Sequence, residues 1–80
     1  MKLDEVKRLA MHADLDVLRK AEIEITEGNT LSIEVHGEDE GEQLTHILSA
    51  IWVLEHMEAN ACNLPIAMRA LTQKVRTSIS

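Results

Sequence analysis

One long segment limits the folds open to this chain, because it is predicted to be a helix with apolar side chains around most of its circumference. The segment runs from about Glu40 to Ala59 and includes the longest apolar run of the sequence, Ile47 to Leu54. Only a narrow polar strip remains, so we expect the rest of the chain to enclose this helix on most sides. Its main apolar stripe, at helical spacing, consists of Leu44, Ile47, Leu48, Ile51 and Leu54, with Trp52 beside it.

Further helices are predicted before and after this segment. Leu3, Val6 and Leu9 have helical spacing, and Asp14 can cap a second short helix. The sequence leaves open whether the N-terminal part forms two helices or one bent helix. After the central segment, Asn63 can cap a last helix, whose apolar stripe consists of Leu64, Ala67, Met68, Leu71, Val75 and Ile79.

Residues 21–35 have a different period, because apolar and polar side chains alternate there. The apolar members are Ala21, Ile23, Ile25, Leu31, Ile33 and Val35. A three-residue loop of Glu27, Gly28 and Asn29 would place all six on one face of a β-hairpin, with Asn29 tolerating the left-handed conformation. The predicted fold class is therefore mainly α (α+β): an N-terminal helix or helix pair, one hairpin, a long central helix and a C-terminal helix. We expect a single domain over residues 1–80.

Composition narrows the classes of function. The 80 residues are 45% apolar and carry a net charge of −6, which disfavours nucleic acid and anionic membranes as partners. Trp52 is the sole aromatic residue, so no platform for stacking bases is available. No apolar run approaches the roughly 20 residues of a membrane span, and the N-terminus is too polar for a signal peptide. We expect a cytoplasmic protein.

The sequence carries no motif of a known catalytic or cofactor site. A lone cysteine, Cys62, cannot form an internal disulfide, and no base is placed near it by a recognisable signature. With three glycines in the chain, a phosphate-binding loop is hardly feasible. We therefore expect neither catalysis nor a cofactor.

A polar strip on the central helix could hold a metal ion. Glu42 and His46 are four residues apart, so both can reach one divalent metal. His56 lies ten residues beyond His46, about 15 Å along the axis, so one helix cannot bring both histidines to the same ion. An antiparallel pair of copies could place His46 of one beside His56 of the other. The alternative is a solvated polar strip that binds nothing.

A DNA-binding arrangement is a further alternative. Two short N-terminal helices followed by a hairpin would resemble a small helix-turn-helix regulator with a wing. The stretch that would face DNA carries Asp14, Asp16, Glu22 and Glu24, whose charge has the wrong sign for phosphates. Nucleic acid is therefore not an expected partner.

The C-terminal half resembles a family of short, uncharacterised helical proteins from bacteria, chiefly Bacteroidetes. The resemblance implies a small helical fold and carries no activity. Members of the family are helical through the region where this chain alternates; here we retain the hairpin. The residues that carry the resemblance are the Met-Lys-Leu start, the helix around Ala50 to Met57, and the ending Ala70-Leu71-Thr72-Gln73-Lys74-Val75 through Ser78-Ile79.

The leading functional hypothesis is a protein-interaction module without catalytic activity that self-associates as a dimer. All fourteen acidic residues lie between Asp4 and Glu58, whereas the last twenty-two residues carry a charge of +3. In a symmetric dimer, the acidic part of one copy can face the basic part of the other. The expected interface residues are Leu48, Ile51, Trp52, Arg69, Lys74 and Arg76. The core of a monomer would account for the apolar members of this set nearly as well. A different protein partner is also compatible with this hypothesis.

Overall fold

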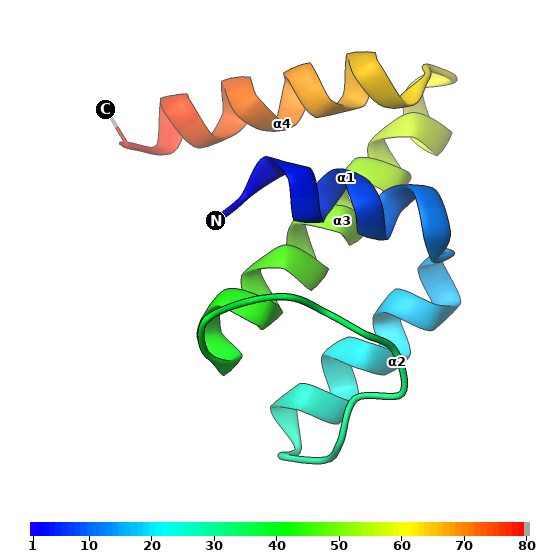
Figure 1. The fold of residues 1–80 in the computed structure, drawn as a ribbon. Coiled ribbons are helices and arrows are strands. Elements are labelled where there is room, and N and C mark those ends of the chain that lie inside the picture. Colours follow the sequence, from blue (N-terminus) through cyan, green and yellow to red (C-terminus); the bar gives the residue numbers. More distant parts are fainter. Residues whose placement is uncertain (80) are drawn as a thin grey trace.

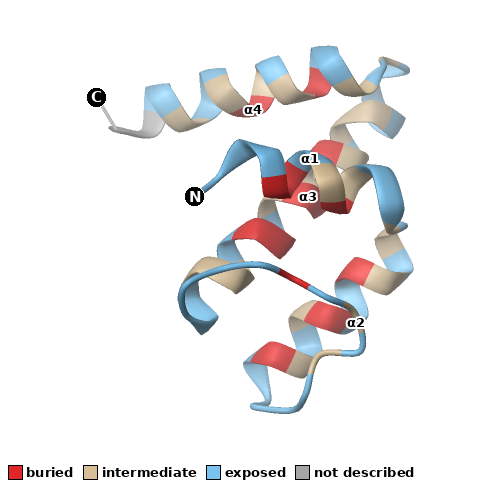
Figure 2. Ribbon diagram, in the orientation of Figure 1, coloured by how far each residue is buried: buried red, intermediate tan, exposed pale blue. Residues whose placement is uncertain are grey.

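The computed structural model describes residues 1–79, with side chains as far as Thr77. Figure 1 shows its four helices, which are α1 (Leu3–His12), α2 (Leu15–Thr26), α3 (Glu40–Asn60) and α4 (Leu64–Ile79). The long helix α3 is central, and the other three each pack against it. Figure 2 shows that the buried positions of α1, α2 and α4 lie on the sides turned toward α3. The prediction of a long central helix is confirmed.

The N-terminal part forms two helices. Ala13 and Asp14 between them both have extended backbone conformations. The Asp14 side chain accepts a hydrogen bond of 2.9 Å from the Val17 amide, which caps α2 as the sequence predicted.

The predicted β-hairpin is wrong, and with it the α+β class, because the described residues 1–79 contain helices but no strand. Ala21 and Ile25 are buried on one side of α2, while Ile23 is 56% exposed on another. Leu18, Ala21 and Ile25 are spaced by three and four residues, so this short segment satisfies the period of a helix as well as that of a strand. The cap at Asp14 starts the helix, and the helix continues through the ambiguous segment.

Glu27, Gly28 and Asn29 end a helix instead of turning a hairpin. Gly28 has φ +75°, and its amide donates to the Ile25 carbonyl at 3.2 Å. The Asn29 amide donates to the Glu24 carbonyl at 2.8 Å. This pair of bonds is the Schellman motif that closes many helices on a glycine. The left-handed residue is therefore Gly28 and not Asn29.

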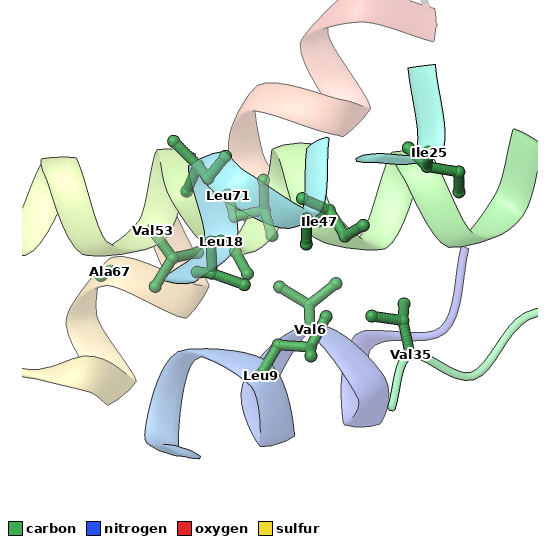
Figure 3. Packing of buried hydrophobic residues seen from close by; sticks show 12 residues of the cluster. Val6, Leu9, Leu18, Ile25, Val35, Ile47, Val53, Ala67 and Leu71 are labelled. Atoms are coloured by element: carbon green, nitrogen blue, oxygen red, sulfur yellow. The ribbon is translucent and has the colours of Figure 1, made fainter. Parts of the chain in front are cut away.

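The alternating residues 31–35 lie in the loop between α2 and α3, which bends at Ser32 and Ile33. Val35 is buried, and Leu31 and Ile33 are half-buried, whereas Ser32 and Glu34 are exposed. The pattern thus indicated correctly which side chains face inward. They pack onto helices, and Figure 3 shows Val35 extending from the loop toward the core.

The core lies where α1, α2 and α4 meet α3 (Figure 3). The buried side of α3 is rotated from the predicted stripe: Ile47 and Ile51 are buried, but Leu48 is 45% exposed. Asn63 caps α4, since its side chain accepts from the Ile66 amide at 3.2 Å. Ile79, the last member of the predicted stripe of α4, lies outside the described side chains. The buried apolar residues are Val6, Leu9, Leu18, Ala21, Ile25, Val35, Ile47, Ala50, Ile51, Val53, Ala67 and Leu71.

The end of α3 is strained at one residue, which supplies a test of the fold. Ala61 is left-handed (φ 50°, ψ 43°), a conformation that costs a residue with a Cβ about 1 kcal/mol. We expect Ala61→Gly to raise the free energy of unfolding by about that amount, measured by urea denaturation. Gly28→Ala is the matched control and should lower the free energy of unfolding. A Cβ at this position meets no atom within 4 Å, so the strain comes only from the positive φ. Equal stability of all three proteins would contradict these helix ends.

Candidate functional site: a buried polar cluster and the outer face of the central helix

A carboxylate of α1 is buried and fully paired. Glu5 is 6% exposed, and Arg8 donates to its two carboxylate oxygens, each at 2.7 Å. The backbone N–H of His36 donates to the same carboxylate at 2.7 Å. Arg8 also donates to the Glu34 carbonyl at 2.8 Å. Glu5 and Arg8 thus attach the loop between α2 and α3 to α1.

The hydrogen bonds around Glu5 set its ionisation. Those from Arg8 lower the pKa of Glu5 to about 2, against the opposing effect of burial, and the His36 amide contributes to the same lowering. The carboxylate in turn raises the pKa of Arg8. A carboxylate with so low a pKa is a poor general acid or base near neutral pH, where catalysis needs a pKa close to the working pH. The chemistry of this cluster is that of an ion pair which holds the loop.

His46 attaches the same loop to α3. Its side chain is fully buried. Nδ1 lies 2.7 Å from the His36 carbonyl, and Nε2 accepts from the Lys2 amide at 2.9 Å. The loop approaches α3 so closely at Gly37 that a Cβ there would lie 2.8 Å from the backbone nitrogen of Gln43. Through its two ring nitrogens, His46 links the loop at His36 to the backbone at Lys2, just before α1.

The three residues of the predicted metal site lie in separate environments. The Glu42 carboxylate accepts from the Glu38 amide at 2.9 Å, and both ring nitrogens of His46 are hydrogen-bonded. His56 stacks on Trp52 with ring centroids 4.8 Å apart, near the other end of α3. Within the described part of the chain, no three His, Cys, Asp or Glu side chains are grouped to hold a metal ion. Metal binding by Glu42, His46 and His56 stays a prediction, and the three side chains do not converge on one point.

The side of α3 that faces away from α1 exposes apolar surface. His46 contacts the backbone before α1, and Leu48, two residues and about 200° further around the helix, lies on the opposite side. Trp52, one turn beyond Leu48, is half-buried. On α2, Arg19 pairs with Glu55 of α3 at 2.9 Å. Ile23 follows Arg19 by one turn, so it lies on the same side of α2.

Helix α4 borders this surface on its other side. The Lys74 ammonium lies 5.1 Å from the centre of the Trp52 ring, which is close enough for a cation–π contact. A shallow groove between α3 and α4 is lined by Trp52, His56, Ala70, Gln73, Lys74 and Thr77. We call the surface formed by Ile23, Leu48, Trp52 and Lys74 the outer face.

The predicted interface residues divide among three locations. Leu48, Trp52 and Lys74 come together on the outer face. Ile51 is 9% exposed and belongs to the core. Arg69 and Arg76 are exposed and seven residues apart, so they share a side of α4, one that differs from the side of Lys74. Sequence reasoning omitted Ile23, because the predicted hairpin placed it on a buried face.

Sequence reasoning also missed the Glu5 cluster as a whole. Glu5 and Arg8 are three residues apart, a spacing that predicts an ion pair on a helix. The hydrogen bond between Glu5 and His36 joins residues 31 apart in sequence, and the one between Lys2 and His46 joins residues 44 apart. Local patterns carry no information about such pairs.

Comparison with other proteins supports the resemblance seen in the sequence. No curated protein and no solved structure matches the chain. In the described residues, no helix is both long enough and apolar enough to cross a membrane. A family model matches the whole of residues 1–80, more than the half on which the resemblance was based. The bacterial group in which the family occurs stays a prediction. The chain thus belongs to a family of unknown function (DUF6952).

Proposed function

We propose that this protein is a self-associating interaction module, and that two copies bind one another through the outer face. The observation that carries the proposal is the apolar surface on the central helix and its neighbour. Leu48 is 45% exposed and Ile23 is 56% exposed, beside a half-buried tryptophan. Single exposed apolar residues are common, but apolar residues gathered on one face beside tryptophan are typical of interfaces.

The distribution of charge favours a second copy as the partner. Helix α4 carries Arg69, Lys74 and Arg76 and no acidic residue, a charge of +3. The whole chain has a net charge of −6, so the rest of it carries −9. Two copies can therefore attract one another if α4 of each faces an acidic region of the other.

The polar clusters fit a binding module better than an enzyme. Among the described residues, the buried ionisable groups are Glu5 and His46. Both carboxylate oxygens and both ring nitrogens are hydrogen-bonded, to Arg8, to Lys2 or to the loop. Both residues line a pocket between α1 and the loop, but a substrate there would meet groups that are already hydrogen-bonded within the protein. The accessible surface of the outer face offers apolar contact and a cation over tryptophan.

The test of the proposal is the mass in solution, measured by light scattering after size exclusion. We expect about 18 kDa, twice the 9.0 kDa of one chain. Leu48→Glu should give the monomer mass, because burying an unpaired carboxylate in the interface costs several kcal/mol. Its own melting temperature should show an intact fold, since Leu48 is not in the core.

Met11→Glu is the matched control, because Met11 is 58% exposed on α1, away from the outer face. This variant should keep the dimer mass. A wild-type mass of 9.0 kDa at high protein concentration would exclude self-association. A Leu48→Glu protein that remains dimeric would exclude the outer face as the interface.

A further inference from the structure

We infer that the two copies join with their α3 helices parallel, about a two-fold axis that runs along α3, so that α4 of each copy faces α2 of the other. This arrangement rests on the proposed function and specifies the geometry of the same surface. It follows from the opposite net charges of α2 and α4, the two helices that border the outer face.

The outer face has α3 at its centre, with α2 and α4 on opposite sides (Figure 1). Contacts of α3 mark the two sides: Glu55 reaches Arg19 of α2, and Trp52 lies under Lys74 of α4. Two such faces can meet about a two-fold axis in the contact plane in two limiting ways. An axis across α3 makes the α3 helices antiparallel and places like helices together, α4 on α4 and α2 on α2. An axis along α3 makes them parallel and places α4 on α2.

Charge distinguishes these two arrangements. Residues 14–27, which are α2 with its capping residues, hold five acids and two bases, a net charge of −3. Residues 64–79 of α4 hold three bases and no acid, a net charge of +3. The antiparallel arrangement would place the two basic helices side by side and the two acidic helices side by side. The parallel arrangement places a basic helix beside an acidic helix twice.

The exposure of these charges lets them act across an interface. Lys74 is exposed beside the outer face, and Arg69 and Arg76 are exposed on another side of α4. On the α2 side, Asp16 and Glu27 are exposed, at helical spacing from Arg19 and Ile23. Charges at contact distance lie within the Debye length of about 8 Å at physiological salt, so they are only partly screened. Glu55 would face its own counterpart in the parallel arrangement, but Arg19 pairs with it at 2.9 Å and offsets its charge.

The parallel arrangement places each residue on the outer side of α3 beside the same residue of the second copy. Thr45 and Ala59 are exposed, and each lies seven residues, an even two turns, from Trp52. They are therefore about 21 Å apart along the helix. In the parallel dimer, Thr45 faces Thr45 and Ala59 faces Ala59. In an antiparallel dimer centred on Trp52, Thr45 of one copy faces Ala59 of the other.

Cross-linking of the full chain with a short bis-maleimide tests this geometry. Thr45→Cys and Ala59→Cys are made separately in a Cys62→Ala background, which removes the native thiol. We expect each variant alone to form a covalent dimer, and labelling with a monofunctional maleimide confirms that each thiol reacts. Cross-linking of the equimolar mixture but of neither variant alone would overturn the inference in favour of the antiparallel dimer.

The mass of the same samples separates failure of this inference from failure of the proposed function. A mass of about 18 kDa with cross-links only in the mixture overturns the parallel arrangement and leaves self-association in place. The same mass with no cross-link in any sample overturns the parallel arrangement and the outer face together. A mass of 9.0 kDa without cross-links overturns self-association itself.

Discussion

Replacing His46 with leucine is expected to lower the free energy of unfolding by about 3 kcal/mol. Leucine fills much of the volume of the fully buried ring, so the cavity is small. It leaves the His36 carbonyl and the Lys2 amide without the partners that the ring supplies at 2.7 and 2.9 Å. Each buried polar group left without a partner costs about 1–3 kcal/mol. Urea denaturation followed through the fluorescence of Trp52 measures the change.

Two further variants separate the contributions of the two ring nitrogens. The amide of asparagine can take the place of Nδ1 and donate to the His36 carbonyl, whereas the side-chain oxygen of glutamine can take the place of Nε2 and accept from the Lys2 amide. Each should recover roughly half of the lost stability. If the leucine variant is as stable as the wild type, the ring does not hold the loop to α3.

Replacing Glu5 with glutamine is expected to lower the free energy of unfolding by roughly 3 kcal/mol at pH 7 and to reduce its dependence on pH. The pKa of Glu5 falls from 4.5 to about 2 in the fold, chiefly through the hydrogen bonds of Arg8. Lowering a pKa by one stabilises the charged form in the fold by about 1.4 kcal/mol. Glutamine also places an N–H₂ group where the carboxylate accepts from Arg8 and the His36 amide.

The sign of the pH effect follows from the depressed pKa of Glu5. Because this pKa is lower in the folded than in the unfolded chain, the stabilisation is fully present above pH 4.5 and is lost as the pH falls toward 2. Urea denaturation at pH 7 and pH 3 should show a steeper loss of stability in the wild type than in Glu5→Gln. Glu58→Gln, an exposed position on α3, serves as the control and should follow the wild type. Parallel curves for all three proteins would contradict a special role for Glu5.

The parts of the fold that depend on neighbouring residues could be predicted from the sequence. The central helix and the caps at Asp14 and Asn63 each rest on side chains within a few positions of one another. The prediction for the segment around Ile23 was wrong because its short apolar run fits both the strand period and the helix period. The helix that begins after Asp14 decides between them. The end of that helix was also misread, since a glycine followed by asparagine is typical of both a hairpin and a Schellman motif.

The candidate site could be predicted only in part. Leu48, Trp52 and Lys74 were expected at an interface, and they do lie together on the outer face. The apolar pattern could not show that Leu48 is exposed and Ile51 buried, because both belong to one broad stripe and the neighbouring helices decide which side is covered. No periodicity could place His36 against Glu5, since the loop between α2 and α3 that carries His36 has no regular conformation.

The attachment of α1 has a consequence for the order in which the chain folds. Helix α1 is held through Glu5 and Lys2 to partners 31 and 44 residues later. Closing such long loops costs more conformational entropy than forming turns between neighbouring residues. This cost is offset only when the distant contacts form. On the ribosome, therefore, α1 cannot complete its contacts until His46 has been synthesised. Of the four helices, α1 is made before the other three, but its contacts are complete only once part of α3 exists, because the backbone at Lys2 is held by the ring of His46.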